Sequence, residues 1–219
     1  MPTGWVVVKE ESPADFLSEH GRNGRVGLLG GAQLGHRLVR WGQAPITSDR
    51  RWSLWSHAVI FAEEDGRRVL YECDFDLRVF PPGLRNGAQV NPIEKYFDPK
   101  RWPYMCVLDF ELTQPQIQEI MDACRLMVGQ RIRYALWGLV TAGLYYRLGC
   151  SIQVRSQPRR RELFCSAFVQ RAFMEVGIRF QGHVPLQRLG PEHIWQTPVP
   201  HVTYIRRKEW DALQGKKPR

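Results

Sequence analysis

The sequence lacks the features that mark several classes of protein. None of its five cysteines forms a CxxC pair, and the glycine-rich stretch 21–35 has neither the GxGxxG nor the GxxxxGK[ST] spacing of a phosphate-binding loop. The longest apolar run, Tyr134–Tyr146, is shorter than the roughly 20 residues of a membrane span. The first residues lack the basic start and apolar core of a secretory signal peptide. We therefore expect a soluble protein without disulfides, cytoplasmic by default.

The composition indicates one folded domain. The chain has 219 residues, 43% of them hydrophobic, with 8 Trp and 10 Phe, which is enough to build one substantial core. We expect a single domain over 1–219, with its core at about 26–205 and a basic C-terminal tail at 206–219.

A net charge of +9 makes an anionic partner plausible, such as a cell-wall polymer or a membrane surface. The basic residues fall in scattered clusters rather than on one helix or RNP-like strand, so no specific nucleic-acid binding is expected.

Strands and helices are expected in blocks rather than in regular alternation. Thr113 is a predicted N-cap with Pro115 in the first turn of a helix to about Val128. Two more helices are predicted, one over Tyr134–Leu148 and one that opens in the segment ELFCSAF. This order favours an α+β fold with a mostly antiparallel sheet. The predicted strands are Trp5–Lys9, Arg25–Leu29, Ser56–Ala62, Arg68–Asp74, Tyr104–Leu112 and Val199–Arg206.

Cys165 stands where the last of these helices begins, directly after three arginines. It lies on the apolar face of the helix, which by itself is typical of a cysteine buried in a core. However, the positive end of a helix dipole and nearby cations both stabilise a thiolate. Cys165 is therefore the candidate nucleophile, whereas the other four cysteines lack this context and are predicted to be structural.

A hairpin brings a histidine and two acids to one face. Asp65-Gly66 between two β-rich runs predicts a two-residue turn, in which paired residue numbers sum to 131. His57, Glu72 and Asp74 then project to the same side, and a histidine beside a carboxylate can serve as the base that a thiolate nucleophile needs. A three-residue loop would move Glu72 to the other face, and a plain surface hairpin would leave all three side chains in water.

No metal or organic cofactor is predicted. His183, His193 and His201 have no compact ligand spacing and no cysteine pair beside them, and His20 and His36 receive no role.

The segments WSHAVIF, LYECDFDLRVFP and LFCSAFVQRAF, in this order, resemble the circularly permuted papain-like amidases, the YiiX/YaeF-like branch of the NlpC-type cysteine hydrolases. The resemblance implies a permuted papain-like fold with the nucleophile helix packed on the sheet. It implies Cys165 as nucleophile, His57 as general base and then acid, and Glu72 as the orienting acid, with Asp74 as the alternative. Expected cleft residues are Ser56, Trp55, Tyr134 and Ser166.

Three functions stay open at this stage. The first is cleavage of an amide bond in a peptide or glycopeptide, above all in peptidoglycan, for instance by a secreted antibacterial toxin with its own export route and an immunity or inhibitor protein. The second is lipid acyl hydrolysis or transfer at a membrane. The third is a non-catalytic module that binds an anionic partner.

Overall fold

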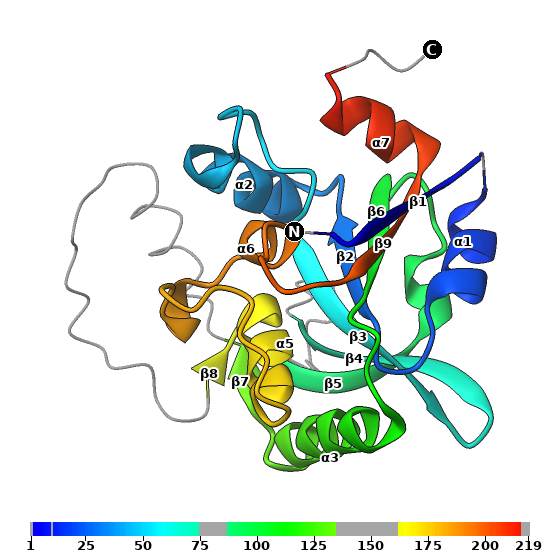
Figure 1. Cartoon of the computed structure of the whole chain (residues 1–219), viewed down its shortest axis with the longest axis vertical. Coiled ribbons are helices and arrows are strands. Elements are labelled where there is room, and N and C mark those ends of the chain that lie inside the picture. The colour runs from blue at the N-terminus through cyan, green and yellow to red at the C-terminus, as the bar shows by residue number, and fades with distance from the viewer. Residues whose placement is uncertain (1, 10, 75–86, 135–161, 216–219) are drawn as a thin grey trace.

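The computed structural model describes residues 2–9, 11–74, 87–134 and 162–215. Seven strands form one open sheet in the order β1-β9-β6-β2-β3-β4-β5 (Figure 1). Among the described strands of this sheet, β1 and β9 pair in parallel and all other neighbours are antiparallel, so the sheet is mixed but mostly antiparallel, as predicted. The strands are β1 (Gly4–Val8), β2 (Val26–Gly30), β3 (His57–Glu64), β4 (Arg67–Asp74), β5 (Gly87–Pro92), β6 (Tyr104–Asp109) and β9 (Val202–Arg206).

The β3–β4 hairpin has the predicted two-residue turn. Glu64 pairs with Arg67, and the register continues to Ile60 and Tyr71, so the paired numbers sum to 131. Asp65 and Gly66 have φ angles of 50° and 71°, the left-handed pair that a tight turn between twisted strands requires. The register therefore places positions 70, 72 and 74 of β4 on one face of the sheet.

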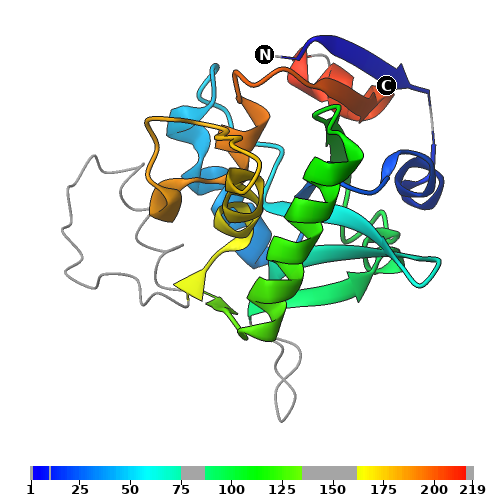
Figure 2. The same ribbon diagram turned by 60° about the horizontal axis from the view of Figure 1, so that its bottom comes forward.

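Helices cover both faces of the sheet. On one face lie α3 (Gln114–Gly129) and α5 (Cys165–Met174), as Figure 2 shows. They bury Ile120, Phe168 and Phe173 against alternate residues of the central strands. On the other face, α1 (Pro13–His20) and the short η2 (Ile93–Tyr96) bury Phe16 and Tyr96 against the intervening residues. The remaining helical elements are α2 (Leu34–Gly42), η1 (Ala44–Ile46), η3 (Leu186–Arg188), α6 (Pro191–Trp195) and α7 (Arg207–Leu213).

The predicted start of α3 is confirmed. Thr113 caps the helix, and its backbone N–H donates to the side-chain oxygen of Gln116 at 3.0 Å, as in a capping box. β6, by contrast, ends at Asp109 rather than at Leu112, because Glu111 turns the chain with a φ of 52°.

The helix predicted over Tyr134–Leu148 does not begin at Tyr134. This residue closes the short strand β7 (Arg133–Tyr134), which pairs in parallel with β8 (Glu162–Leu163). The rest of the predicted helix lies outside the described residues.

The fold extends beyond the core predicted at about 26–205. β1 adds a strand beside β9, and α1 contributes Phe16 and Leu17 to the core. The expected basic tail is also wrong at its start, because Arg206 ends β9 with 3% of its surface exposed and α7 follows. Its guanidinium pairs with the fully buried carboxylate of Glu209, at 3.1 Å from Nε to Oε1. No helix among the described residues is long and apolar enough to cross a membrane.

This buried ion pair should stabilise the end of the chain. Glu209→Ala leaves the Arg206 guanidinium buried without its partner, so we expect the free energy of unfolding to fall by about 3 kcal/mol. The matched control is Asp211→Ala in the exposed pair with Arg207 (3.7 Å), which should cost less than about 1 kcal/mol. Urea unfolding followed by circular dichroism measures both values. Equal losses would mean that α7 is not part of the folded core.

Candidate active site

Cys165 is the first residue of α5 and follows Phe164, which has an extended backbone and caps the helix. The thiol lies at the positive end of the helix dipole, as the sequence predicted, and the residue exposes 2% of its surface. Cys73 on β4 helps to place it, because its Sγ donates to the backbone oxygen of Leu163 at 3.1 Å. This contact joins the sheet to the segment that leads into Cys165.

His57 connects the nucleophile to Glu72. It is the first residue of β3, and its Nε2 lies 2.6 Å from Oε2 of Glu72. The imidazole also lies close enough to Cys165 for that side chain to raise its pKa. Since Glu72 takes Nε2, Nδ1 is the ring nitrogen left for the thiol. Both His57 and Glu72 are buried, with 2% and 0% of their surface exposed.

The carboxylate of Glu72 is held by several donors besides His57. Asn91 Nδ2 donates to Oε1 at 2.6 Å, the Lys95 ammonium donates to the same oxygen, and the Tyr96 hydroxyl donates to Oε2. A buried carboxylate needs such partners, because leaving water costs several kcal/mol unless its oxygens are paired. The arrangement fixes the position of Glu72 and, through it, the orientation of the His57 ring.

The electrostatics of the site favour an ion pair. Burial alone would lower the pKa of His57, but the nearby Cys165 side chain and the hydrogen bond to Glu72 raise it to about 10. Burial likewise works to raise the pKa of Glu72, but the hydrogen bond from His57 and the charge of Lys95 lower it to about 2. At neutral pH the site therefore holds an imidazolium beside the ionised carboxylate of Glu72.

Asp74, the alternative orienting acid, has a different partner. Its carboxylate lies 2.7 Å from the Lys95 ammonium, and its side chain is 13% exposed. Asp74 thus adds negative charge near His57, whereas Glu72 makes the hydrogen bond to the ring.

His57, Glu72 and Asp74 are also a possible set of metal ligands, because one ligand atom of each lies within 4.8 Å of the other two. The Lys95 ammonium, however, already contacts both carboxylates. A divalent cation would have to share this space with the positive charge of Lys95. The two carboxylates and His57 therefore fit a hydrogen-bonded network with Lys95 and not a metal site.

Three of the four predicted cleft residues have partners within the fold. Trp55 is fully buried in the core, where its large apolar side chain packs against Trp195 with ring centroids 5.2 Å apart. The prediction that Trp55 lines the cleft is therefore wrong. The Ser56 hydroxyl accepts from the Gly31 N–H at 3.0 Å, and the buried Ser166 hydroxyl donates to the Leu189 carbonyl. For Tyr134 the structure gives the backbone in β7, opposite Leu163, and its role in the cleft stays a prediction.

Aromatic rings that the sequence did not indicate surround His57. The ring centroids of His36, Trp102 and Tyr96 lie 6.4, 6.2 and 6.0 Å from that of His57. Burial and the charge of His57 lower the pKa of His36 to about 4, so this second imidazole is neutral at pH 7.

The residues that hydrogen-bond to Glu72 were also not predicted, although the sequence of β5 contains an indication of one of them. In β5, Gln89 is opposite Glu72 and Asn91 lies two residues further along the same face. Recognising GAQVNP as a strand would have indicated Asn91. Lys95 and Tyr96 lie beyond the strand, and the path of η2 decides where they point.

The comparisons with known proteins bear on the fold. No protein-family model matches the sequence, and no curated protein matches it either. Among solved structures, the crystal structure of the metalloprotein YiiX from Escherichia coli O157:H7 matches with a TM-score of 0.55. The match covers 84% of this chain and 96% of that chain, at 11% sequence identity.

The chain has a YiiX-like fold. At this identity the likeness shows the fold alone. The match confirms the resemblance to YiiX at the level of the fold. The roles of Cys165, His57 and Glu72 are argued from the geometry of the site in this chain.

The raised pKa of His57 predicts its titration. The ring should stay protonated until the pH approaches about 10, and the substitution Cys165→Ser should lower this pKa, because the Cys165 side chain helps to raise it. NMR of histidine-labelled protein measures it. A raised folded-state pKa stabilises the fold in full below the ordinary value of 6.5, and this stabilisation is lost as the pH rises through about 10. Titration of His57 near 6.5 in both proteins would contradict the ion pair.

Proposed function

We propose that this protein is a cysteine hydrolase that cleaves an amide bond through a thioester acyl-enzyme. The observation that carries the proposal is the buried series of Cys165, His57 and Glu72, in which His57 is hydrogen-bonded to Glu72 and lies near a cysteine at the N-terminus of α5. A buried, charged series of this kind is costly to maintain and matches the needs of nucleophilic catalysis.

Each step uses a group already in place. The Cys165 thiolate attacks the amide carbonyl, and the carbonyl oxygen becomes an oxyanion near the backbone N–H groups of the first turn of α5. The tetrahedral intermediate collapses to a thioester as the His57 imidazolium gives its proton to the leaving amine. Neutral His57 then takes a proton from water, which attacks the thioester. The products are an amine and a carboxylic acid, and the thiolate–imidazolium pair is restored.

Glu72 orients this chemistry without exchanging a proton. Its lowered pKa keeps it ionised throughout, and its bond to Nε2 directs Nδ1 toward the thiol. YiiX, the protein of similar fold, is described as a metalloprotein. For this chain we propose a mechanism in which Lys95, rather than a metal, neutralises the carboxylates.

The proposed substrate is a peptide or glycopeptide, and in particular the peptide of bacterial peptidoglycan. The resemblance of the His57 and Cys165 segments to NlpC-type amidases supports it, together with a net charge of +9 that would attract the protein to anionic cell-wall polymers. An antibacterial toxin with a matching immunity protein is the biological setting that we propose.

Incubation with peptidoglycan fragments in the presence of hydroxylamine tests the mechanism. Hydroxylamine intercepts a thioester, so we expect a peptidyl hydroxamate as well as the free acid. Cys165→Ala should lower kcat/KM by about 10⁴-fold or more. Glu72→Gln should lower it by about 10²- to 10⁴-fold. The matched control, Asp74→Asn, should cost less than about tenfold. Cleavage that persists in Cys165→Ala would overturn the proposal.

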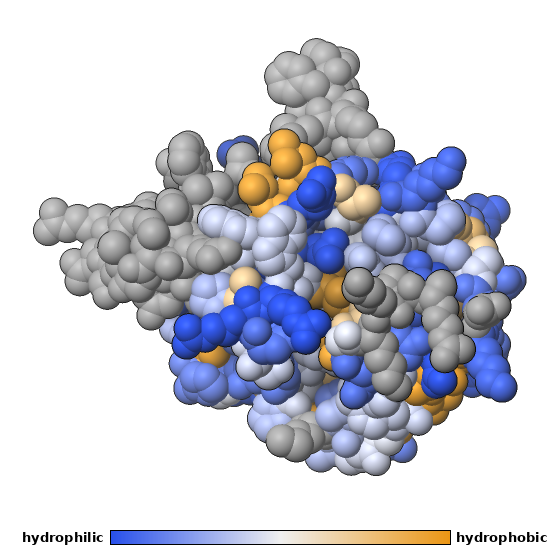
Figure 3. All heavy atoms as spheres, turned by 90° about the horizontal axis from the view of Figure 1, so that it is seen from above, coloured by the Kyte–Doolittle hydropathy of each residue, from blue (hydrophilic) through white to orange (hydrophobic). Residues whose placement is uncertain are grey.

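A second candidate, acyl hydrolysis or transfer on lipids, has one structural feature in its favour. α2, which carries His36 beside the site, exposes an apolar face: Leu34, Leu38 and Trp41 expose 72%, 57% and 39% of their surface. The spacing places these three residues on one side of the helix. Seen from above in Figure 3, the molecule presents hydrophobic residues next to strongly hydrophilic ones. Such a face on a protein with a net charge of +9 suits an anionic membrane.

Sedimentation with vesicles of phosphatidylglycerol and phosphatidylcholine tests this candidate. The double variant Leu34→Gln/Leu38→Gln should reduce vesicle binding by about tenfold or more, since each leucine loses apolar surface that the lipid would bury. The matched control is Leu126→Gln, which removes a leucine 61% exposed on α3. A fatty-acyl hydroxamate from these vesicles would favour the lipid reaction. Equal binding by both variants would argue against α2 as the membrane face.

A further inference from the structure

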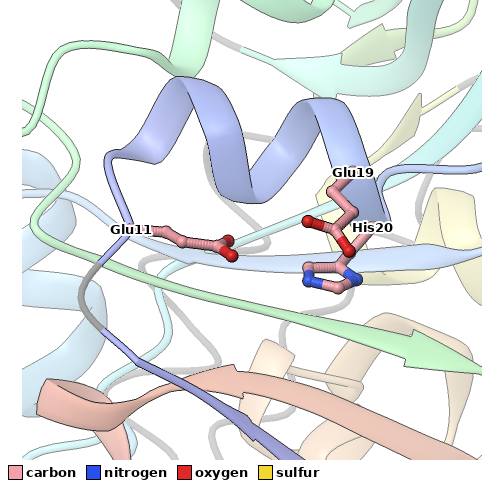
Figure 4. Close-up of side chains that lie close together, drawn as sticks. All are labelled: Glu11, Glu19 and His20. Atoms are coloured by element: carbon pink, nitrogen blue, oxygen red, sulfur yellow. The ribbon is translucent and has the colours of Figure 1, made fainter.

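A second cluster of metal-ligand side chains lies at α1, apart from the candidate active site. Glu11 precedes the helix, and Glu19 and His20 end it. Figure 4 shows the Glu11 side chain running along the helix toward its last turn, where the His20 ring lies beside the Glu19 carboxylate. One ligand atom from each of the three residues lies within 4.8 Å of the other two.

Two buried atoms of this cluster have no hydrogen-bond partner among the described residues. They are Oε2 of Glu11 and Nε2 of His20. His20 is 7% exposed and is enclosed by the rings of Phe16 and Tyr204, at centroid distances of 5.0 and 4.8 Å. Buried polar atoms are nearly always satisfied, so an unpaired carboxylate oxygen and an unpaired imidazole nitrogen in two residues of one cluster point to a common ligand.

The charges around the cluster favour a cation. Glu19 lies in the last turn of α1, where the helix dipole is negative and an acidic side chain is unfavourable. Three guanidinium groups lie near the cluster, and each has another partner. Arg22 donates from Nε to the backbone oxygen of Glu19 at 3.2 Å. Arg25 lies 2.6 Å from the Asp109 carboxylate, and Arg206 is paired with Glu209. None of these three contacts is made to the unpaired oxygen of Glu11.

We propose that Glu11, Glu19 and His20 bind a divalent transition-metal ion such as Zn²⁺. Two carboxylate oxygens and one imidazole nitrogen are a donor set that zinc accepts, with water in the fourth position because Glu19 is on the surface. The ion would join the chain before α1 to the last turn of the helix. Because His20 stacks on Tyr204 of β9, it would also fasten α1 to the sheet.

Zinc titration of the full-length Cys165→Ser protein tests the site, since this background removes the candidate nucleophile as a competing ligand. Isothermal titration calorimetry should show one Zn²⁺ per chain. At a hundredfold excess of zinc over its Kd, the Tm should rise by about 5 °C. X-ray absorption at the zinc edge should show nitrogen and oxygen ligands without sulfur.

Glu19→Gln is the decisive variant, because Glu19 is exposed and its loss should not disturb the core. We expect zinc affinity to fall at least tenfold in Glu19→Gln and in His20→Gln. The matched control is Asp15→Asn, which removes the same charge from the first turn of α1 and should keep the wild-type affinity. Equal losses of zinc affinity in Glu19→Gln and Asp15→Asn would mean that surface charge alone explains the effect, and this would overturn the proposal. Zinc bound through sulfur, or no binding at all, would also overturn it.

Discussion

The candidate active site depends on one buried carboxylate. Glu72 exposes none of its surface, and an ionised carboxylate at that depth is stable only while its oxygens are paired. His57, Asn91, Lys95 and Tyr96 supply the donors, from β3, β5 and η2. The requirement to satisfy one side chain therefore holds three separate elements together at one end of the sheet.

The hydrogen bond from His57 to Glu72 also affects the orientation and the protonation of the imidazole. Without Glu72 at Nε2, burial would favour a neutral ring that is free to turn. With it, the His57 ring is fixed at Nε2, and Glu72 together with Cys165 raises its pKa so that it keeps its proton at neutral pH. The thiol is positioned by the start of α5. Phe168 and Phe173 pack this helix against β3 and β4 in the large apolar core. The geometry of the site is thus a consequence of how α5 and the sheet pack.

Local chemistry explains which parts could be predicted. The Asp65-Gly66 turn accepts left-handed backbone at both positions, so two residues were enough to set the register of β3 and β4 and the shared face of Glu72 and Asp74. The capped start of α3 and the position of Cys165 at the start of α5 follow from signals within a few residues. The errors arose where the local signal was weak. β5 and α1 carry polar residues that hide their periodicity, and Arg206 looked like part of a basic tail although Glu209 neutralises it within the fold.

By itself, the sequence determined the elements and the local order of the residues: a hairpin with His57 and two acids on one face, and a cysteine at a helix N-terminus. Local sterics and hydrogen bonding encode these features. Only the tertiary structure decided that Glu72 and not Asp74 contacts the imidazole, that Lys95 lies between the two carboxylates, and that Trp55 belongs to the core. These choices depend on contacts between residues distant in the chain, where the cost of burying a charge selects one partner among several.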